Sequence, residues 1–140
     1  MKYLLDTCII SEMVKPKPER TVVEWLLDQN ETDLYVSVLT FGELHRGIER
    51  LPGSRKKESL HAWVENDLKE RFSNRTLDIN IIVAKIWGRI QGVAEKKGKP
   101  MPVIDSLIAA TGIAYGLIVV TRNGADTEQS GVALFNPWIQ

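Results

Sequence analysis

The feature that most constrains the fold is a set of short apolar runs without polar alternation. Tyr3–Leu5 and Leu117–Val120 contain no polar side chain that breaks the apolar pattern, which is typical of strands covered on both faces of a parallel sheet. Leu34–Val38 and Val132–Phe135 predict two more strands, and Thr76–Ile79 predicts a short one. Parallel strands need crossover connections, so we expect helices between these runs.

Helical periodicity fills the intervals between the predicted strands. Thr40-Phe41-Gly42-Glu43 has the form of a capping box, which predicts a helix start there, and Gly116 has the position of a C-terminal glycine cap. The helices predicted from apolar spacing and breakers span residues 7–14, 19–29, 40–51, 54–71, 80–97 and 105–115. The alternation predicts a single α/β domain over residues 1–140, with a mostly parallel sheet of roughly five strands.

Composition excludes several classes of protein. No apolar run reaches the roughly 18 residues that a membrane helix needs, and Asp6 and Glu12 interrupt the region where a signal peptide would have its apolar core. The single cysteine, Cys8, excludes an internal disulfide and fits a cytoplasmic protein. The 18 basic and 18 acidic residues cancel, so nucleic-acid binding would have to depend on a local patch.

Four acidic residues follow predicted strands or open the helices after them. Asp6 follows the first strand, and Glu43 lies in the helix after the second. Asp105 opens a helix, and Asp126 lies in the turn after Leu117–Val120. Ligands of open α/β sheets bind beyond the carboxyl ends of the strands. Each acid taken alone is explained by helix capping, worth about 1 kcal/mol, but four at one rim indicate a shared site.

Such a group of carboxylates predicts a cation, because the acids repel one another and burial raises the cost of ionising them. Magnesium suits the site, since it prefers oxygen ligands and needs few carboxylates. No competing metal site is expected. His45 and His61 are the only histidines, and neither has a Cys or His partner at the spacing of a zinc site. We interpret His45 as a residue of the helix surface.

Four blocks of this sequence, and a closing segment, occur in order in one known family. They are Tyr3-Leu-Leu-Asp-Thr7, Ser37-Val-Leu-Thr-Phe-Gly-Glu-Leu-His-Arg-Gly-Ile48, Pro102-Val-Ile-Asp-Ser-Leu-Ile-Ala-Ala110, Val120-Thr-Arg-Asn-x-x-Asp126 and Gly131-Val-x-Leu-x-Asn-Pro-Trp138. With this order and spacing, over essentially the whole chain, the sequence resembles the PIN-domain ribonucleases, specifically the VapC toxins of VapBC toxin–antitoxin pairs. The resemblance implies an α/β/α sandwich of the PIN type.

Carried over by position, the family pattern makes Asp6, Glu43, Asp105 and Asp126 the catalytic and metal-binding acids. The resemblance implies that Asp6 and Asp105 bind Mg²⁺ or Mn²⁺ most directly. Asp126 would lie beside them, and Glu43 would hold or orient a water. The implied reaction is hydrolysis of an RNA phosphodiester, in tRNA or another structured RNA.

The resemblance also assigns polar support around the acids to Thr7, Thr121 and Asn123. Two departures occur in the fourth block. Thr127 replaces an aromatic residue that commonly follows the last acid in relatives, and Gly124-Ala125 makes the turn small. These departures make the metal contact of Asp126 the least direct of the four.

RNA binding needs positive charge around the acids. Arg46 and Arg50 follow Glu43 by three and seven residues, which places them on the same helix face. The resemblance implies that Arg46 lies at the mouth of the pocket. The candidate RNA-binding residues are Arg46, Arg50, Arg122, Lys15 and Lys17. The zero net charge, together with the resemblance, implies a homodimer that pools two half-grooves.

The resemblance further implies a VapB-type antitoxin protein as partner, possible higher toxin–antitoxin assemblies, and no membrane association. Two other functions stay open from the sequence. One is a catalytically silent PIN-fold module that binds RNA or protein. The other is a phosphatase with Asp6 as nucleophile, although that chemistry usually has a second Asp two residues later, where this chain has Cys8.

Overall fold

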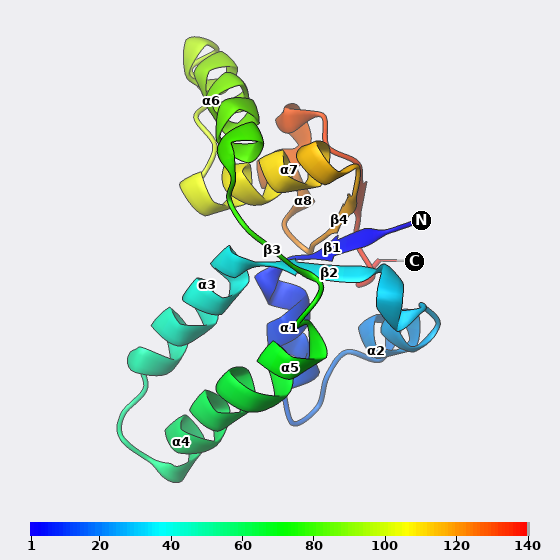
Figure 1. Cartoon of the computed structure of the whole chain (residues 1–140), viewed down its shortest axis with the longest axis vertical. Helices are drawn as coiled ribbons and strands as arrows, with labels where there is room; N and C mark the ends of the chain where they lie inside the picture. Colours follow the sequence, from blue (N-terminus) through cyan, green and yellow to red (C-terminus); the bar gives the residue numbers. More distant parts are fainter. Residues whose placement is uncertain (140) are drawn as a thin grey trace.

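A computed structural model describes residues 1–139 and shows a five-stranded sheet in which all strands are parallel (Figure 1). The strand order is β3-β2-β1-β4-β5. The strands span Tyr3–Leu5 (β1), Leu34–Ser37 (β2), Thr76–Leu77 (β3), Ile118–Val120 (β4) and Leu134–Phe135 (β5). The predicted parallel α/β architecture is therefore confirmed.

The central position of β1 explains why its sequence is apolar on both faces. Tyr3 is in register with Leu34 of β2 on one side and with Ile118 of β4 on the other. Leu4 and Leu5 are fully buried. The backbone N–H of Asp6 donates to the carbonyl of Val120 at 3.0 Å, so the pairing of β1 with β4 continues to the point where the acid begins.

Helices cover both faces of the sheet (Figure 1). One face carries α1 (Thr7–Met13), α2 (Arg20–Leu27), α3 (Val38–Glu49), α4 (Arg55–Ala62) and α5 (Lys69–Arg71). The other face carries α6 (Ile81–Lys96), α7 (Val103–Tyr115) and α8 (Gly124–Thr127). The remaining helical segments are η1 (Glu31–Asp33), η2 (Trp63–Leu68) and η3 (Glu128–Ser130). No helix in this described part of the chain has the length and apolar character that a membrane crossing requires.

Two apolar cores lie on the two sides of the sheet. The first joins the strands to α1 and to the end of the long helix 55–71, through residues such as Ile9, Leu68 and Phe72. The second joins the strands to α7 through Ile108 and Ala109. Asp6 caps α1, and Asp105 lies in the first turn of α7. The packing of these two helices therefore fixes the positions of the two acids relative to the sheet.

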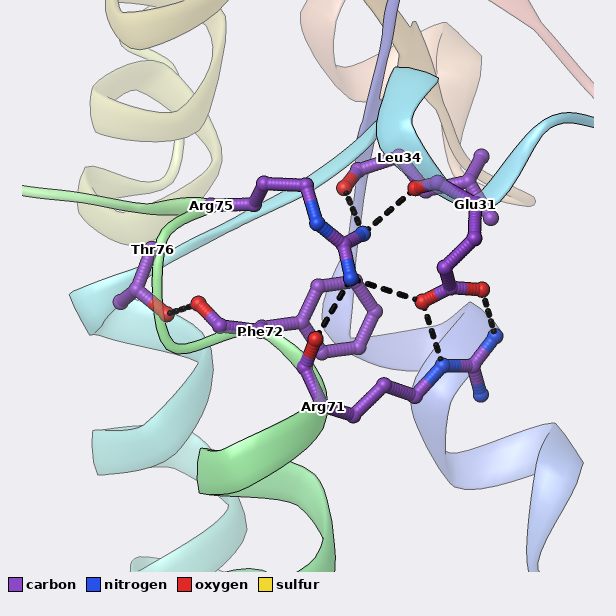
Figure 2. Close-up of polar contacts among 6 residues, drawn as sticks. All are labelled: Glu31, Leu34, Arg71, Phe72, Arg75 and Thr76. Atoms are coloured by element: carbon purple, nitrogen blue, oxygen red, sulfur yellow. Dashed lines mark hydrogen bonds and ion pairs between the residues drawn. The ribbon is translucent and has the colours of Figure 1, made fainter.

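A polar network ties the end of α5 to the start of β2 (Figure 2). The carboxylate of Glu31 accepts two hydrogen bonds from Arg71, at 2.8 and 2.9 Å, and one from Arg75 at 2.9 Å. Arg75 also donates to the carbonyls of Glu31 and Leu34, both at 2.6 Å. The bonds from Arg71 hold the pKa of Glu31 below its ordinary value despite partial burial. Both guanidinium groups lie near the ring of Phe72, at 5.2 and 4.9 Å.

Three predicted boundaries near the acids are wrong. The third helix begins at Val38 rather than Thr40, because the hydroxyl of Ser37 caps it by accepting from Leu39 N–H at 3.1 Å. The helix that carries Asp105 begins two residues earlier, at Val103. Asp126 lies on the short helix α8 rather than in a turn. As a result Glu43 lies in the second turn of its helix, Asp105 lies inside the first turn rather than at the helix start, and Asp126 is helical.

Candidate active site

Asp6 is the most firmly held acid at the carboxyl edge of the sheet. Its side chain is buried, with 8% of its surface exposed. One carboxylate oxygen accepts from the backbone N–H of Thr7 at 2.8 Å and so caps α1. The other accepts from the hydroxyl of Thr121, beyond the end of β4, also at 2.8 Å. Donors at the start of α1 and just beyond β4 therefore fix one carboxylate, and each oxygen keeps acceptor capacity for a further ligand.

Glu43 reaches the same edge from the second turn of α3. Its Oε1 atom accepts from the hydroxyl of Thr7 at 2.6 Å. The Thr7 hydroxyl also lies 3.3 Å from the hydroxyl of Thr40, which is fully buried. The carboxylate of Glu43 thus bonds across to α1 rather than back to the start of its own helix, as a capping box would require.

Asp105 faces the other acids from the first turn of α7. The pKa of its carboxyl is raised to about 6, mainly by burial and then by the charges of Asp6, Asp126 and Glu43, in that order of size. Within residues 1–139 its carboxylate accepts no hydrogen bond from a side chain or from a backbone N–H. The ionised form of Asp105, which the other acids disfavour, is therefore not stabilised by a hydrogen bond from this part of the chain.

Asp126 completes the group from α8 and is the most exposed of the four acids. Its backbone N–H donates to the carbonyl of Asn123 at 3.1 Å. The N–H of Asn123 in turn donates to the hydroxyl of Thr121 at 3.0 Å, the group that holds Asp6. A chain of bonds thus links the turn before α8 to the buried acid, while the side chain of Asn123 is exposed.

The four carboxylates are close enough to repel but are not tightly gathered. Among residues 1–139, no three of them bring one oxygen each within 4.8 Å of one another. A donor set made only of carboxylates suits a hard divalent cation, and Mg²⁺ keeps several of its waters when it binds proteins. Such waters bridge wider spacings than direct ligation does. The residues present therefore fit a hydrated hard cation.

Cys8 lies beside this site as a packed thiol. Its sulfur is 3.9 Å from an oxygen of Asp6 and 3.7 Å from the hydroxyl of Thr121, and it accepts from the N–H of Arg122 at 3.5 Å. Burial and then the charge of Asp6 raise the pKa of the thiol above its ordinary value. A raised pKa disfavours the reactive thiolate, so the contacts of Cys8 favour a packing role.

The candidate RNA-binding cations are all exposed, but they differ in their surroundings. Arg46 lies in the last turn of α3 and makes no ion pair with any acid of residues 1–139, and Arg50 caps the same helix. Lys15 pairs with Glu12 at 2.8 Å. The Arg122 guanidinium lies 5.3 Å from the centre of the Trp138 ring. Lys17 lies in the loop between α1 and α2.

Glu12 is a buried acid that the sequence analysis did not identify. Its carboxylate accepts from the ammonium of Lys15 and from the backbone N–H of Glu19, both at 2.8 Å. The bond from Lys15 is the main reason why the pKa of Glu12 lies below its ordinary value. Glu12 therefore holds the loop between α1 and α2, which carries the candidate cations Lys15 and Lys17. The three-residue spacing from Lys15 was its visible signal.

An apolar hollow adjoins the acids on the side of α1 and α3. Its volume is about 210 Å³, and Thr7 and Glu43 form its polar end. The rest of the wall is mostly apolar and comes from α1, α3, α4 and η2, including Leu44, Ile48, Leu60 and Trp63. The acidic edge and this hollow together form a polar site that continues into an apolar groove.

Comparison with known proteins agrees with this arrangement. The family model described as PIN domain matches residues 3–129. The chain is 38% identical to the toxin FitB of Neisseria gonorrhoeae over 135 residues, 96% of this chain and 97% of FitB. It is 30% identical to the VapC ribonuclease Y4jK of Sinorhizobium fredii, with 96% of each chain covered. A solved structure of FitAB bound to an IR36 DNA fragment superposes with a TM-score of 0.92 at 36% identity, covering 99% of this chain and 96% of that one.

Proposed function

This chain belongs to the PIN-domain family, and we propose that it is a metal-dependent endoribonuclease and the toxin of a toxin–antitoxin pair. Relatives named as a VapC ribonuclease and as a toxin cover nearly its whole length. The observation that carries the proposal is the raised pKa of Asp105, to about 6, under the charges of three other acids. Four carboxylates from separate segments oppose one another at one edge, which costs stability unless a cation is bound.

We assign the cation, Mg²⁺ or Mn²⁺, to Asp6, Asp105 and Asp126. When bound, it would activate a water, polarise the phosphoryl oxygen and stabilise charge on the leaving oxygen. Asp6 is already fixed by Thr7 and Thr121, so little motion is needed to present its oxygens. Among the residues that the structure describes, the Asp105 carboxylate has no hydrogen-bond partner to lose.

Glu43 has a different role in this proposal. The Thr7 hydroxyl holds one of its oxygens at 2.6 Å, which leaves the other oxygen to orient a water beside the scissile phosphate. In the hydrolysis, the oxygen of this water bonds to phosphorus, one ester P–O bond breaks, and the leaving ribose oxygen takes up a proton. A fixed carboxylate lowers the cost of placing the water for attack.

The substrate we propose is RNA, with tRNA or another structured RNA as the class to test. Arg46 and Arg50 extend along α3 beyond Glu43, and Arg122 lies just before α8. These cations would contact the phosphates on both sides of the scissile bond. A homodimer would double the basic surface of a chain whose net charge is zero.

The partner we propose is a VapB-type antitoxin, within a larger toxin–antitoxin assembly of the cytoplasm. The apolar hollow beside Glu43 would accept apolar side chains from an amphipathic helix of this partner. A basic side chain of such a partner would then neutralise the acids and exclude the cation. The solved FitAB assembly, which is bound to DNA, is one precedent for such a complex among the structural neighbours.

The test is RNA cleavage by the purified chain, followed by mapping of the new 5′ ends. We expect cleavage of tRNA or another structured RNA with Mg²⁺ or Mn²⁺, none with a chelator, and none by Asp6→Asn or Asp105→Asn. Asp78→Asn removes an exposed acid outside the site and should cleave at the wild-type rate. Unchanged cleavage by Asp6→Asn would refute the assignment, and metal binding without any cleavage would favour a silent binding module.

A further inference from the structure

Two histidines and an acid that are far apart in sequence meet on the surface of the helical arm formed by α3 and α4. His45 comes from α3, His61 from the last turn of α4, and Glu65 from η2. One ligand atom from each lies within 4.8 Å of the others. Among residues 1–139 this is the one group of three or more His, Cys, Asp or Glu side chains gathered so closely.

The distances among the three side chains are close to those of a metal site, although a hydrogen bond joins His45 and Glu65 where a metal would lie. His45 Nε2 lies 2.8 Å from Oε1 of Glu65, and the two imidazole rings have centroids 5.5 Å apart at an interplanar angle of 63°. Two imidazoles that ligate one tetrahedral zinc through bonds of about 2.0 Å have centroids about 5 Å apart. Small side-chain rotations therefore suffice to converge the three ligands.

The arm is built so that these side chains face one another. Pro52 and Gly53 lie in the turn between α3 and α4. Ser54 caps α4 by accepting from Lys57 N–H at 3.2 Å, and the ammonium of Lys57 donates to the carbonyls of Glu49 and Leu51. These bonds close the turn of the arm. Figure 1 shows α4 running back beside α3.

The segment that supplies Glu65 is unusual. Residues Trp63–Leu68 form a π-helical stretch inside the continuous helix 55–71. Such stretches are rare in proteins, and many of those that occur lie at functional sites. Val64 and Leu68 are buried in the core, with about 1% of each exposed, so their packing holds this stretch in place. His61 and Glu65 are four residues apart and share the face turned toward α3.

This group is separate from the acidic site. Glu43 and His45 are two residues apart on α3 and point in nearly opposite directions around the helix. Glu43 lines the hollow that it shares with Thr7. His45 and Glu65 line a different cavity of about 410 Å³, together with Phe41 and others.

We propose that His45, His61 and Glu65 bind one zinc-class cation that clips α3 to the helix 55–71. Imidazole ligands favour Zn²⁺, Co²⁺ and Ni²⁺ over Mg²⁺, so the chain carries two sites of different metal preference. The fourth ligand is a water, since three protein ligands leave one tetrahedral position open. The clip restrains the arm on which Glu43 and Arg46 lie. The proposal does not depend on the ribonuclease activity.

The test measures Zn²⁺ binding by calorimetry on chelator-treated chain without a histidine tag. All variants carry Asp6→Asn and Asp105→Asn, so that the acidic site does not contribute. We expect one Zn²⁺ per chain in this background, bound in the micromolar range or tighter. Because disturbing outer-shell partners alone weakens metal sites by about 10–100-fold, losing a ligand through His61→Gln or Glu65→Gln should weaken binding at least about 100-fold.

Asp67→Asn is the matched control, because it removes an exposed charge from the same helix without touching the group. It should bind Zn²⁺ as the background does. His61 is exposed, so His61→Gln should melt at the background temperature without metal and lose the stabilisation by Zn²⁺. Absence of Zn²⁺ binding in the background, or equal binding by His61→Gln, would overturn the proposal. Neither result bears on RNA cleavage, which is measured with the acids intact and Mg²⁺.

Discussion

The hydroxyl of Thr7 donates to Oε1 of Glu43 at 2.6 Å and joins α1 to α3 inside the acidic site. The same residue uses its backbone N–H to hold Asp6 at 2.8 Å. One threonine therefore positions two of the four acids through different atoms. Only the side-chain contact is removable by mutation, which gives a way to test the orientation of Glu43 alone.

Thr7→Val should lower the rate of RNA cleavage while leaving Asp6 in place. A hydrogen bond to a charged group contributes about 1.5–3 kcal/mol, which corresponds to about a 10- to 100-fold loss if Glu43 acts in the transition state. Single-turnover cleavage measures this loss. Thr7→Ser should retain most of the activity because it keeps the hydroxyl, and Thr32→Val, at an exposed position, should have no effect. A wild-type rate for Thr7→Val would show that Glu43 needs no such anchor.

The electrostatics of Asp105 predict a pH-dependent stability in the absence of metal. Its pKa is about 6 in the folded chain, against an ordinary 3.8. Between these values the folded chain holds a proton that the unfolded chain has lost. Stability therefore falls as the pH rises through this window. The full loss is present at pH 7.

Asp105→Asn should remove that loss. Two pKa units correspond to about 2.7 kcal/mol, but Asp105 is only half buried, so we expect about 1 kcal/mol, or roughly 3 °C in Tm at pH 7. The gain should vanish near pH 4.

Millimolar Mg²⁺ should make the wild type more stable than Asp105→Asn, because Mg²⁺ at 100 times its Kd stabilises the wild type by about 2.7 kcal/mol. Melting curves in chelator and in Mg²⁺ measure both effects, with Asp78→Asn as control. Equal gains at both pH values would contradict the repulsion.

The position of Arg46 makes it the strongest test of RNA contact. It is exposed in the last turn of α3 and unpaired with any acid of residues 1–139. Arg46→Ala should weaken RNA binding and reduce the salt dependence of log K by about one. Filter binding at several salt concentrations with inactive Asp6→Asn chain measures this. Arg89→Ala is the control, because Arg89 is an exposed arginine on α6. Lys57 would be a poor control, because its ammonium donates to the carbonyls of Glu49 and Leu51. Equal effects would remove Arg46 from the interface.

The sequence was sufficient for the sheet, because its strands follow from apolar runs, and the end of the first strand placed Asp6 at the sheet edge. Asp105 follows no strand, so its approach to the other acids depends on how α7 packs. Helix starts were less predictable. Ser37 and Thr40 both have the chemistry of a cap, and both are fully buried. The Ser37 hydroxyl caps the helix, whereas the Thr40 hydroxyl lies against that of Thr7. That packing is a tertiary fact without a local signal.

Contacts across long sequence separations were also beyond prediction. His45 and His61 were judged to lack metal-site partners because their spacing fits no zinc motif, yet the turn between α3 and α4 brings their rings to 5.5 Å. The four-residue spacing of His61 and Glu65 was visible, but it gains meaning only when α3 supplies the third ligand. Glu31 likewise meets Arg71 and Arg75 across 40 and 44 residues.

Gly112 tests how closely α7, and with it Asp105, must approach the sheet. A Cβ at this position would lie 2.7 Å from a methyl of Val119 and 2.9 Å from a methyl of Val132. Val119 and Val132 are buried, so neither side chain moves away easily. Gly112→Ala should therefore destabilise by about 1–3 kcal/mol, or roughly 3–10 °C in Tm.

Gly92 provides the opposite case in the interior of α6, where an added Cβ meets nothing within 4 Å. Gly92→Ala should stabilise the chain by about 0.5–1 kcal/mol through helix propensity alone. Comparing the two melting temperatures separates helix propensity from packing. If Gly112→Ala were as stable as Gly92→Ala, α7 would have room to shift away from β4. The depth of Asp105 beside Asp6 would then not be set by this contact.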